Sequence, residues 1–424
     1  MNSPTVTIGI DVGTSGCRAV AVAATGEVRA EVRAPFPEPE GRDGCREQDP
    51  EVWWRAVADC IGRIAADLRA EPVTALAVDG TSGTLLLTDA DGQPCTPGLL
   101  YNDRRAVAEA RRIAAVAPVE SGAHGATSAL AKLLYLQPRA GDRVRHALHQ
   151  ADWIAGRLTG RWGVSDENNA LKLGYDPRLR DWPDWLPGLG VPVAWLPRVV
   201  APGRTVGRLA AEVAGALGLP ASVEVVAGTT DSVAGVLATG VHDIGDAVTS
   251  LGSTLALKVW AEVPVFAPEH GVYSHRLGER WLVGGASNSG GAVLLEYFDR
   301  HELDRLTPAL RPNRLTGLDY YPLAAPGERF PVADPEWPPR LEPRPADRVD
   351  FLQGMLEGIT AIERDGYRLL AELGAPYPRR VVTTGRGAAN EPWRRMRERA
   401  LGVPVEQAEH WEAAYGTALL AARG

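Results

Sequence analysis

A strand, a glycine-containing turn and a second strand are predicted at the start of the chain, and this pattern returns in its second half. The first copy runs from the β-branched residues 6–10 through Asp11-Val-Gly-Thr-Ser-Gly-Cys-Arg18 into the apolar residues 19–23. The second runs from Asp246 through a Ser-Leu-Gly-Ser-Thr turn into residues 255–259. Two such hairpins in one chain predict two similar halves with a ligand between them.

The first turn has the chemistry of a phosphate site. Gly13 and Gly16 are expected to adopt positive φ angles there. Backbone N–H groups at such a turn can face an anion, and the hydroxyls of Thr14 and Ser15 add donors. The carboxylate of Asp11 is the kind of oxygen ligand that a phosphate-bound Mg²⁺ takes. A plain turn, in which the aspartate satisfies nearby amides, is the alternative.

The overall composition is that of a globular protein. With 424 residues, two domains are expected, and the net charge of −8 argues against nucleic acid as a partner. The four cysteines have neither Cys-x-x-Cys spacing nor a metal-ligand spacing with the histidines, so a reduced, cytoplasmic protein is expected. Neither a leader peptide nor an apolar run of about 18 residues is found, so no membrane association is expected.

Two long amphipathic helices are predicted in addition to the hairpins. One covers residues 52–69, after Asp49 and Pro50 in N-cap and first-turn positions, and the other covers residues 349–373. Prolines concentrate between residues 322 and 345, where a long surface loop is expected.

Two further strand ends carry polar residues. The apolar run 73–78 leads into Asp79-Gly-Thr-Ser-Gly-Thr84, which places Thr81 and Ser82 on a loop where α/β proteins keep binding sites. A simple turn is the alternative. The run 223–228 leads through Thr229-Thr-Asp-Ser232 into a predicted helix over 233–239. Asp231 at this helix start is an N-cap, or a carboxylate that takes a proton from a substrate hydroxyl, or both.

Glycine-rich turns also mark the C-terminal half. Gly284-Gly-Ala-Ser-Asn-Ser-Gly-Gly291, before a predicted helix over 292–298, is interpreted mainly as close packing, with a phosphate site as the alternative. In Thr384-Gly-Arg-Gly-Ala-Ala-Asn-Glu-Pro-Trp393, the glycines would let a flat ring lie against the backbone. Asn390 would hydrogen bond that ring and Trp393 would stack on it. The final helix, 412–422, has small residues on every face and is expected to be buried.

The order of these motifs resembles that of the FGGY carbohydrate kinases over nearly the whole chain. The five motifs are Asp-x-Gly-Thr-x-x-x-Arg at residues 11–18, Leu-Tyr-Asn-Asp-x-Arg at 100–105, Gly-Thr-Thr-Asp-Ser at 228–232, Ser-Leu-Gly-Ser-Thr at 250–254, and Gly-x-Gly-Ala-x-Asn at 385–390. Further segments, at residues 78–84, 151–153, 169–175 and 317–322, look like the compact plant and cyanobacterial type of pentulose kinase, associated with D-ribulose.

The resemblance implies an α/β fold of two ribonuclease-H-like domains of the actin and hexokinase type, with ATP and sugar meeting in the cleft between them. An N-terminal, sugar-side domain would cover residues 1–238, and a C-terminal, nucleotide-side domain residues 239–411. The helix over 412–424 would pack back onto the N-terminal domain. The partners would be a small sugar and ATP, and the protein would be a monomer or a homodimer.

The resemblance also assigns roles to individual residues. Asp11 would bind Mg²⁺ through water, Thr14 would face the phosphates, and Asp231 would be the general base. Thr81 and Ser82 stand where xylulokinases have a sugar-contacting Met-His pair, and Asp103 would border the sugar pocket. The C-terminal residues implied to bind nucleotide are Gly252, Ser253 and Thr254 at the second hairpin, and Gly387, Asn390 and Trp393 at adenosine. Arg386 replaces a glycine usual in the adenosine motif.

Transfer of a phosphoryl group from ATP to the primary hydroxyl of a ketopentose is therefore the expected activity, with D-ribulose as the first candidate. D-xylulose or another polyol is the alternative within this class. Two alternatives from other classes are an ATPase switch of the actin or heat-shock-protein type and a non-catalytic sugar sensor.

Overall fold

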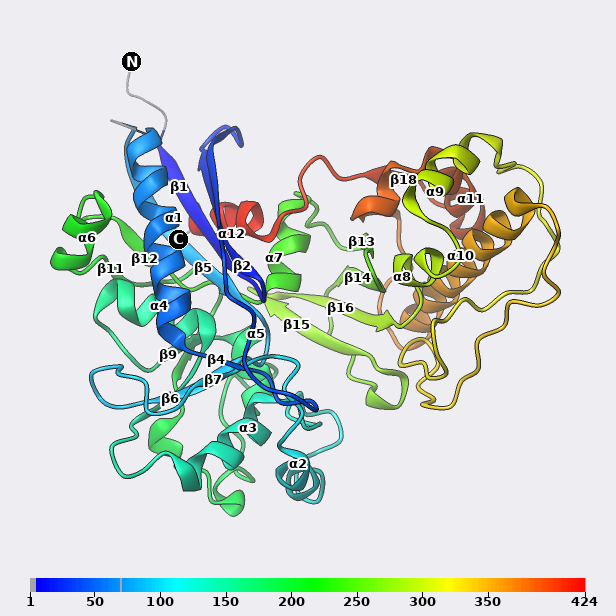
Figure 1. The fold of residues 1–424 in the computed structure, drawn as a ribbon. Coiled ribbons are helices and arrows are strands. Elements are labelled where there is room, and N and C mark those ends of the chain that lie inside the picture. The colour runs from blue at the N-terminus through cyan, green and yellow to red at the C-terminus, as the bar shows by residue number, and fades with distance from the viewer. Residues whose placement is uncertain (1–4, 69–70, 424) are drawn as a thin grey trace. The chain divides into compact units, whose positions relative to one another are not determined.

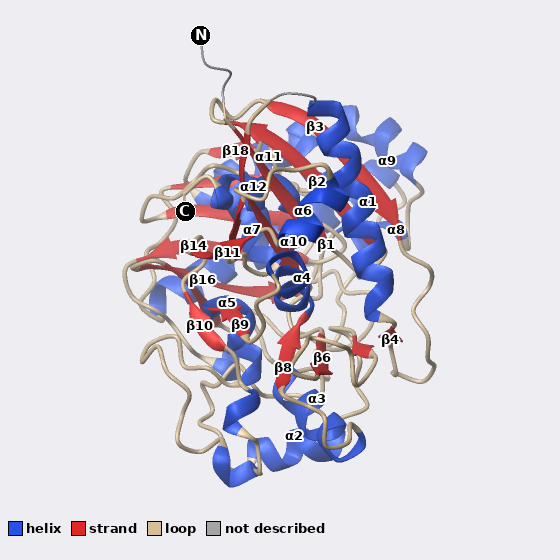
Figure 2. Cartoon of the chain, turned by 90° about the vertical axis from the view of Figure 1, so that its left-hand side faces the viewer, coloured by secondary structure: helices blue, strands red, loops and turns tan. Residues whose placement is uncertain are grey.

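The computed structural model describes residues 5–68 and 71–423, which belong to two compact units. The N-terminal unit consists of Met1–Ala238 together with Glu412–Gly424, and the C-terminal unit of Thr239–Trp411. Each unit is built around a six-stranded sheet with helices packed on it (Figures 1 and 2). This confirms the prediction of an α/β chain with two sheet-containing domains.

The sheet of the N-terminal unit has the strand order β11-β12-β5-β1-β2-β3. Its strands are β1 Val6–Val12, β2 Gly16–Ala23, β3 Val28–Pro35, β5 Val73–Gly80, β11 Thr205–Arg208 and β12 Glu224–Val226. β1, β2 and β3 form an antiparallel meander, whereas β5 runs parallel to β1 and β12 runs parallel to β5. The carboxyl ends of β1, β5 and β12 therefore lie at one edge of the sheet.

Helices cover both faces of this sheet. The helices are α1 Pro50–Leu68, α4 Gln150–Thr159 and α6 Ala211–Leu217 on one face, with α7 Asp231–Ala238 and α12 Ala413–Ala421 on the other. α12 lies directly on the backbone of β1, because a Cβ atom added at Gly9 would be 1.9 Å from the Ala414 carbonyl oxygen. α12 also touches α7, since a Cβ atom at Gly416 would be 1.9 Å from the Ala234 oxygen.

A smaller subdomain is inserted into the N-terminal unit. Its four-stranded sheet has the order β4-β7-β6-β8, and a two-stranded sheet pairs β10 with β9. The elements are β4 Glu47–Gln48, β6 Leu85–Thr88, β7 Gly98–Leu99, β8 His146–His149, β9 Val164–Asp166, β10 Arg198–Val200, α2 Val107–Ala114, α3 Ala129–Leu136 and α5 Glu167–Ala170. Leucines and alanines of α3 and β6 form its own apolar core.

The C-terminal unit has a sheet of order β15-β16-β14-β13-β17-β18, on which the long helix α10 packs with α11 (Figure 1). Its elements are β13 Asp246–Leu251, β14 Leu255–Ala261, β15 Tyr273–Leu277, β16 Arg280–Ser287, β17 Arg380–Thr384, β18 Val405–Gln407, α8 Gly291–Leu295, α9 Arg300–Leu306, α10 Arg348–Glu372 and α11 Glu391–Leu401. β13 and β14 form the second hairpin, and β17 runs parallel to β13.

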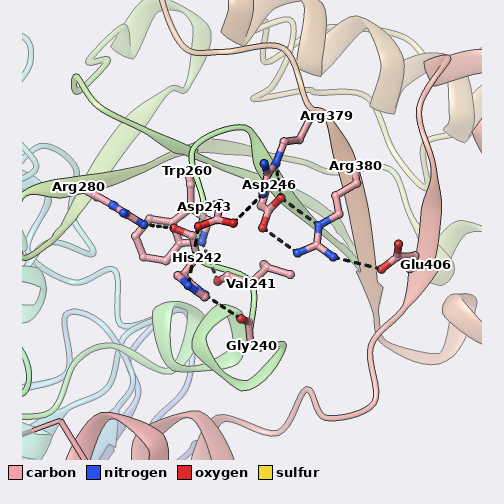
Figure 3. A network of polar contacts seen from close by, with 10 residues as sticks. All are labelled: Gly240, Val241, His242, Asp243, Asp246, Trp260, Arg280, Arg379, Arg380 and Glu406. Atoms are coloured by element: carbon pink, nitrogen blue, oxygen red, sulfur yellow. Dashed lines mark hydrogen bonds and ion pairs between the residues drawn. The ribbon is translucent and has the colours of Figure 1, made fainter.

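A network of ion pairs fixes the start of the C-terminal unit (Figure 3). Both oxygens of the buried Asp246 carboxylate accept hydrogen bonds from Arg380, at 3.0 and 2.9 Å, and Arg379 donates to one of them at 2.7 Å. Arg379 also reaches the exposed Asp243 at 2.8 Å, and Arg280 donates to the His242 carbonyl oxygen. The segment that enters β13 is thereby held to β16 and β17.

The predicted positions of the helices and strands agree closely with the structure, but the backbone conformation predicted for two glycines does not. The helix expected over 52–69 is α1, of which Arg69 lies outside the described residues. Gly13 and Gly16 are not among the glycines with positive φ, so the turn prediction was wrong on that point. Gly16 is instead required by space, because a Cβ atom there would be 2.7 Å from the Ala34 oxygen of the neighbouring strand β3.

Candidate active site

Three aspartates gather at the carboxyl edge of the N-terminal sheet. Asp11 lies near the end of β1 and is paired in register with Asp79 near the end of β5. Because residues paired in parallel strands project to the same face, both carboxyl groups point the same way. Asp231 begins α7, in the connection that follows β12, and its charge acts on both of the others. Two of these three residues, Asp11 and Asp231, are the predicted catalytic pair.

The proximity of these carboxyl groups changes their acidity. Burial, and then the charge of Asp231, raise the pKa of Asp11 to about 6, while the neighbouring Asp79 carboxyl group and the nearby Arg18 act in the opposite direction. Burial, followed by the charge of Asp11, raises the pKa of Asp79 well above its ordinary value. A cation at this edge would relieve the repulsion.

Helix α12 holds Asp79 from the other side. The Thr417 hydroxyl donates a hydrogen bond to Oδ2 of Asp79, and both residues are completely buried. Asp79 was not predicted as a site residue. Its position, as an acid at the end of an apolar strand just as Asp11 is, was the available signal.

Asp231 is not the N-cap of its helix. The Thr230 carbonyl oxygen accepts hydrogen bonds from the amides of Val233 and Ala234, which places Thr230 at the cap position. Oδ1 of Asp231 accepts a hydrogen bond from the Ser232 amide at 2.7 Å, and the residue is partly exposed. The N-cap alternative is therefore excluded, and a negative charge in this first turn is favoured by the helix dipole.

The first hairpin leaves its turn residues accessible. Thr14 is partly exposed and Ser15 is exposed, and the Gly13 amide donates to the Gly16 carbonyl oxygen at 3.0 Å. Arg18, which is paired with Asp11 across the hairpin, forms ion pairs with Glu31 and with Glu412. The turn thus offers hydroxyl donors beside a carboxylate.

The turn after β5 is held by buried polar contacts. The Thr81 hydroxyl is 2.6 Å from that of Thr84 and donates to Oε1 of Gln150 at 3.1 Å, so it is engaged within the protein. Thr81 is buried, whereas Ser82 is partly exposed. Nε2 of Gln150 is buried without a hydrogen-bond partner in the described structure. Ser82 is therefore the residue of the predicted pair that is available to a ligand.

Asp103 is buried and bonded within the protein instead of being exposed to solvent. Its carboxylate is completely buried and accepts hydrogen bonds from the Arg46 amide at 2.6 Å and from Nε of Arg105 at 2.9 Å. That Asp103 borders the sugar pocket stays a prediction, and its oxygens accept hydrogen bonds from the protein itself. It orders the segment 99–105 and holds Arg105.

The second hairpin packs on the glycine-rich turn before α8. A Cβ atom at Gly290, whose φ is +145°, would be 2.8 Å from the Ser253 carbonyl oxygen, and the amide of Gly291 donates to the Gly252 oxygen at 2.8 Å. Close packing is thus the reason for these glycines. Ser253 and Thr254 remain exposed and Gly252 partly so.

The predicted adenosine residues are largely engaged within the protein. Trp393 is 3% exposed, and its indole N–H donates to the Thr360 hydroxyl at 2.9 Å, so its ring is part of the core and the stacking prediction was wrong. Asn390 caps α11 by accepting the Trp393 amide. A Cβ atom at Gly387 would be 2.8 Å from that of Leu251, so this glycine serves close packing on the second hairpin.

A divalent cation fits this donor set only together with a ligand. No group of three or more His, Cys, Asp or Glu side chains is arranged to hold a metal ion within residues 5–68 and 71–423. Mg²⁺ retains waters and is usually bound through one or two carboxylates plus substrate phosphates. Asp11 meets that requirement, because a bound cation would relieve its repulsion by Asp231. Mg²⁺ would neutralise phosphate charge there.

No described helix has the length and apolar character needed to cross a bilayer.

Comparisons with known proteins cover both units. The family model described as the N-terminal domain of the FGGY family of carbohydrate kinases matches residues 6–238, and that of the C-terminal domain matches residues 247–424. The xylulose kinase of Escherichia coli (strain K12) is 28% identical over 92% of this chain and 83% of its own length. That of Bacillus subtilis (strain 168) is 26% identical over 98% and 88%.

Solved structures give the same result at the level of the fold. A xyloylose kinase from Brucella ovis superposes with a TM-score of 0.88, at 26% identity, over 98% of this chain and 90% of that one. A glycerol kinase from Plasmodium falciparum, solved with ADP, has a TM-score of 0.84 at 16% identity, covering 99% and 89%. The chain belongs to the FGGY family of carbohydrate kinases, enzymes that transfer a phosphoryl group from ATP to a sugar.

Proposed function

We propose that this protein phosphorylates the primary hydroxyl of a ketopentose, using ATP and Mg²⁺, and that D-ribulose is its substrate. The observation that carries the proposal is the pair of carboxyl groups, Asp11 and Asp231, that meet at one sheet edge within the N-terminal unit. One carboxylate is available for a metal and one for a proton, which are the two tasks of a kinase site.

Asp231 acts as the general base in this proposal. Its partly exposed carboxylate, at the first turn of α7, would accept the proton of the attacking hydroxyl as the new P–O bond forms. General-base catalysis is typically worth about 10² to 10⁴ in rate. The remaining acceleration would come from positioning, since phosphoryl transfer needs little covalent help from the protein.

Asp11 and the first hairpin would hold the phosphates of the nucleotide. Thr14 and Ser15 would donate to phosphate oxygens, and Gly252, Ser253 and Thr254 are the residues of the second hairpin that the family resemblance assigns to the nucleotide. Their exposure supports this assignment. Mg²⁺ supplies positive charge for the phosphates when it is bound. Asp11 would orient it through water.

The choice of D-ribulose depends on the turn after β5. Ser82 presents a small hydroxyl where xylulokinases carry part of a Met-His pair, and the resemblance to pentulose kinases of the D-ribulose type points in the same direction. D-xylulose is the second candidate, because the relatives named above are xylulose kinases. The two sugars differ in the configuration of one hydroxyl group.

The test is ADP release by the purified protein with D-ribulose, D-xylulose, L-ribulose, L-xylulose, ribitol and glycerol. The proposal expects sugar-dependent release, with the highest kcat/KM for D-ribulose. A higher kcat/KM for D-xylulose would reject the D-ribulose assignment and keep the kinase. ATP hydrolysis that no sugar stimulates would indicate an ATPase switch, and sugar binding without turnover a sensor.

A further inference from the structure

The chain has only three lysines among its 45 basic residues, and two of them meet at the turn after β5. Lys132, on α3, donates a hydrogen bond to the Gly83 carbonyl oxygen. Lys172 lies against the same glycine, because a Cβ atom at Gly83 would be 3.2 Å from its Cδ. A chain that uses arginine almost everywhere therefore uses lysine beside this turn. Lysine is a compact charge with three donors, whereas arginine is a wide planar fork.

Lys132 joins two separate segments of the backbone. Its Nζ is 2.7 Å from the Gly83 oxygen and 2.7 Å from the Leu100 oxygen. Gly83 directly follows Ser82, and Leu100 begins the turn that ends at Asp103. One ammonium group thus fixes the distance between the turn 81–84 and the segment 99–105. The two bonded residues, Gly83 and Leu100, are 17 positions apart in the sequence.

The surroundings of Lys132 disfavour a cation overall, because burial and the charge of Lys172 outweigh the attraction of Asp103. The residue is 0% exposed, and its ammonium forms no ion pair within the described part of the chain. The nearest acid, Asp103, is occupied by Arg105 and by the Arg46 amide. A buried charge without an opposite charge costs stability. Two hydrogen bonds to carbonyl oxygens and the attraction of Asp103 offset this cost only in part, since the pKa of Lys132 is still lowered, so stability does not explain the lysine.

We infer that Lys132 is a positioning residue for the sugar: it clamps the turn carrying Ser82 to the segment 99–105 so that both are preorganised for the substrate. This inference rests on the proposed function, because it takes the turn after β5 as the sugar side. Lys132 does not touch the reacting atoms. Preorganised groups bind a ligand without the cost of ordering them, so loss of the clamp should appear mainly in sugar binding.

Lys132→Met tests the clamp, because it keeps the apolar stem and removes the ammonium. The expected result is a rise in KM for the sugar of roughly tenfold or more, since hydrogen bonds to a charged group are each worth about that factor. KM for ATP should stay within about twofold. Hydrogen exchange of the Thr84 and Asp103 amides, which close the two turns by donating to Thr81 and Leu100, should become faster in the absence of sugar.

Ser128→Ala is the matched control. Ser128 caps α3, the helix that carries Lys132, by accepting the Ala131 amide at 3.1 Å. Its loss should lower the melting temperature, since an N-cap is worth about 1 kcal/mol, and leave KM for the sugar unchanged. A rise in KM that appears equally in both variants would assign Lys132 a merely structural role.

Two results would overturn the inference without touching the proposed function. Unchanged exchange of both amides in a folded Lys132→Met variant would show that no clamp exists. Faster exchange with an unchanged KM for the sugar would show that the clamp does not serve the sugar. Conversely, a wild-type protein that phosphorylates no ketopentose would disprove the proposed function. Hydrogen exchange of the Thr84 and Asp103 amides would still decide whether Lys132 joins the two segments.

Discussion

Two buried charges show how differently single residues are accommodated in this chain. Asp246 is completely buried and accepts three hydrogen bonds from Arg379 and Arg380, which lower its pKa to about 2 against the opposing effect of burial. Lys132 is equally buried, but its ammonium donates to two carbonyl oxygens and forms no ion pair with the described residues. The first residue anchors the C-terminal unit, and the second carries a cost that requires a functional explanation.

Asp246→Asn is expected to destabilise the C-terminal unit by about 1–3 kcal/mol, because it removes the charged acceptor that two arginines share. Thermal unfolding of both forms measures this loss. Asp243→Asn is the matched control: its side chain is 53% exposed and contacts the same Arg379, so its loss should cost less than about 1 kcal/mol. Equal losses in the two variants would contradict the anchoring role of Asp246.

The stability contributed at Lys132 should depend on pH. Burial, and then the charge of Lys172, lower its pKa to about 7, against the attraction of Asp103; Arg105 adds to the lowering. The unfolded value is about 10.4. Between these values the unfolded chain binds more protons, so the cost of the buried charge is full below pH 7 and is relieved as the pH rises.

The melting temperature of the wild type, relative to that of Lys132→Met, should therefore rise between pH 6 and pH 9. Ser128→Ala should follow the wild type, because it keeps the lysine. A difference between wild type and Lys132→Met that stays constant over this range would show that the pKa of Lys132 is not lowered.

The sequence was sufficient to predict that Asp11 and Asp231 lie at strand ends, where the structure has them, but not to predict contacts that depend on packing. Asp11 and Asp231 could be selected because each follows an apolar strand. Trp393 was assigned to a ligand because aromatic rings stack, but the sequence alone does not show that Thr360 on a distant helix accepts its N–H. Lys132 was overlooked as one polar residue in an apolar helix, which was the available signal.

At the scale of elements, α12 packs against its neighbours with its backbone in direct contact with theirs. It lies on β1 through Gly9 and on α7 through Gly416, and its Thr417 holds Asp79. The small residues of 412–422 correctly predicted burial, and every described residue of α12 except Ala413 and Leu419 is buried. Which strand they would meet depends on residues some four hundred positions earlier, which no local pattern contains.

Gly9→Ala is expected to destabilise the N-terminal unit by about 1–3 kcal/mol, because the new methyl group would be 1.9 Å from the Ala414 oxygen and backbone must shift. Gly62→Ala, in the middle of α1 with nothing within 4 Å, should instead stabilise the protein by up to about 1 kcal/mol. Urea unfolding of both variants compares them. A neutral Gly9→Ala would show that α12 does not rest on β1.

At the scale of the whole molecule, the two units share one sheet plan. The order β3-β2-β1-β5-β12 in the first corresponds to β16-β14-β13-β17-β18 in the second, with three antiparallel strands followed by two parallel ones. The repeated hairpin was therefore a sound guide to the fold. It was weaker for the substrate, because the configuration of a sugar is recognised by loops such as 81–84 and 99–105, whose geometry the sequence does not determine.

Asp231→Asn gives the most direct measurement of the central claim, with sugar phosphate formed from ATP and D-ribulose as the quantity followed. We expect a rate lowered by about 10² to 10⁴, with a melting temperature close to that of the wild type, because the Thr230 cap is kept. A variant that retains most of the phosphorylation would show that Asp231 is not the general base, since no base would then be needed at residue 231.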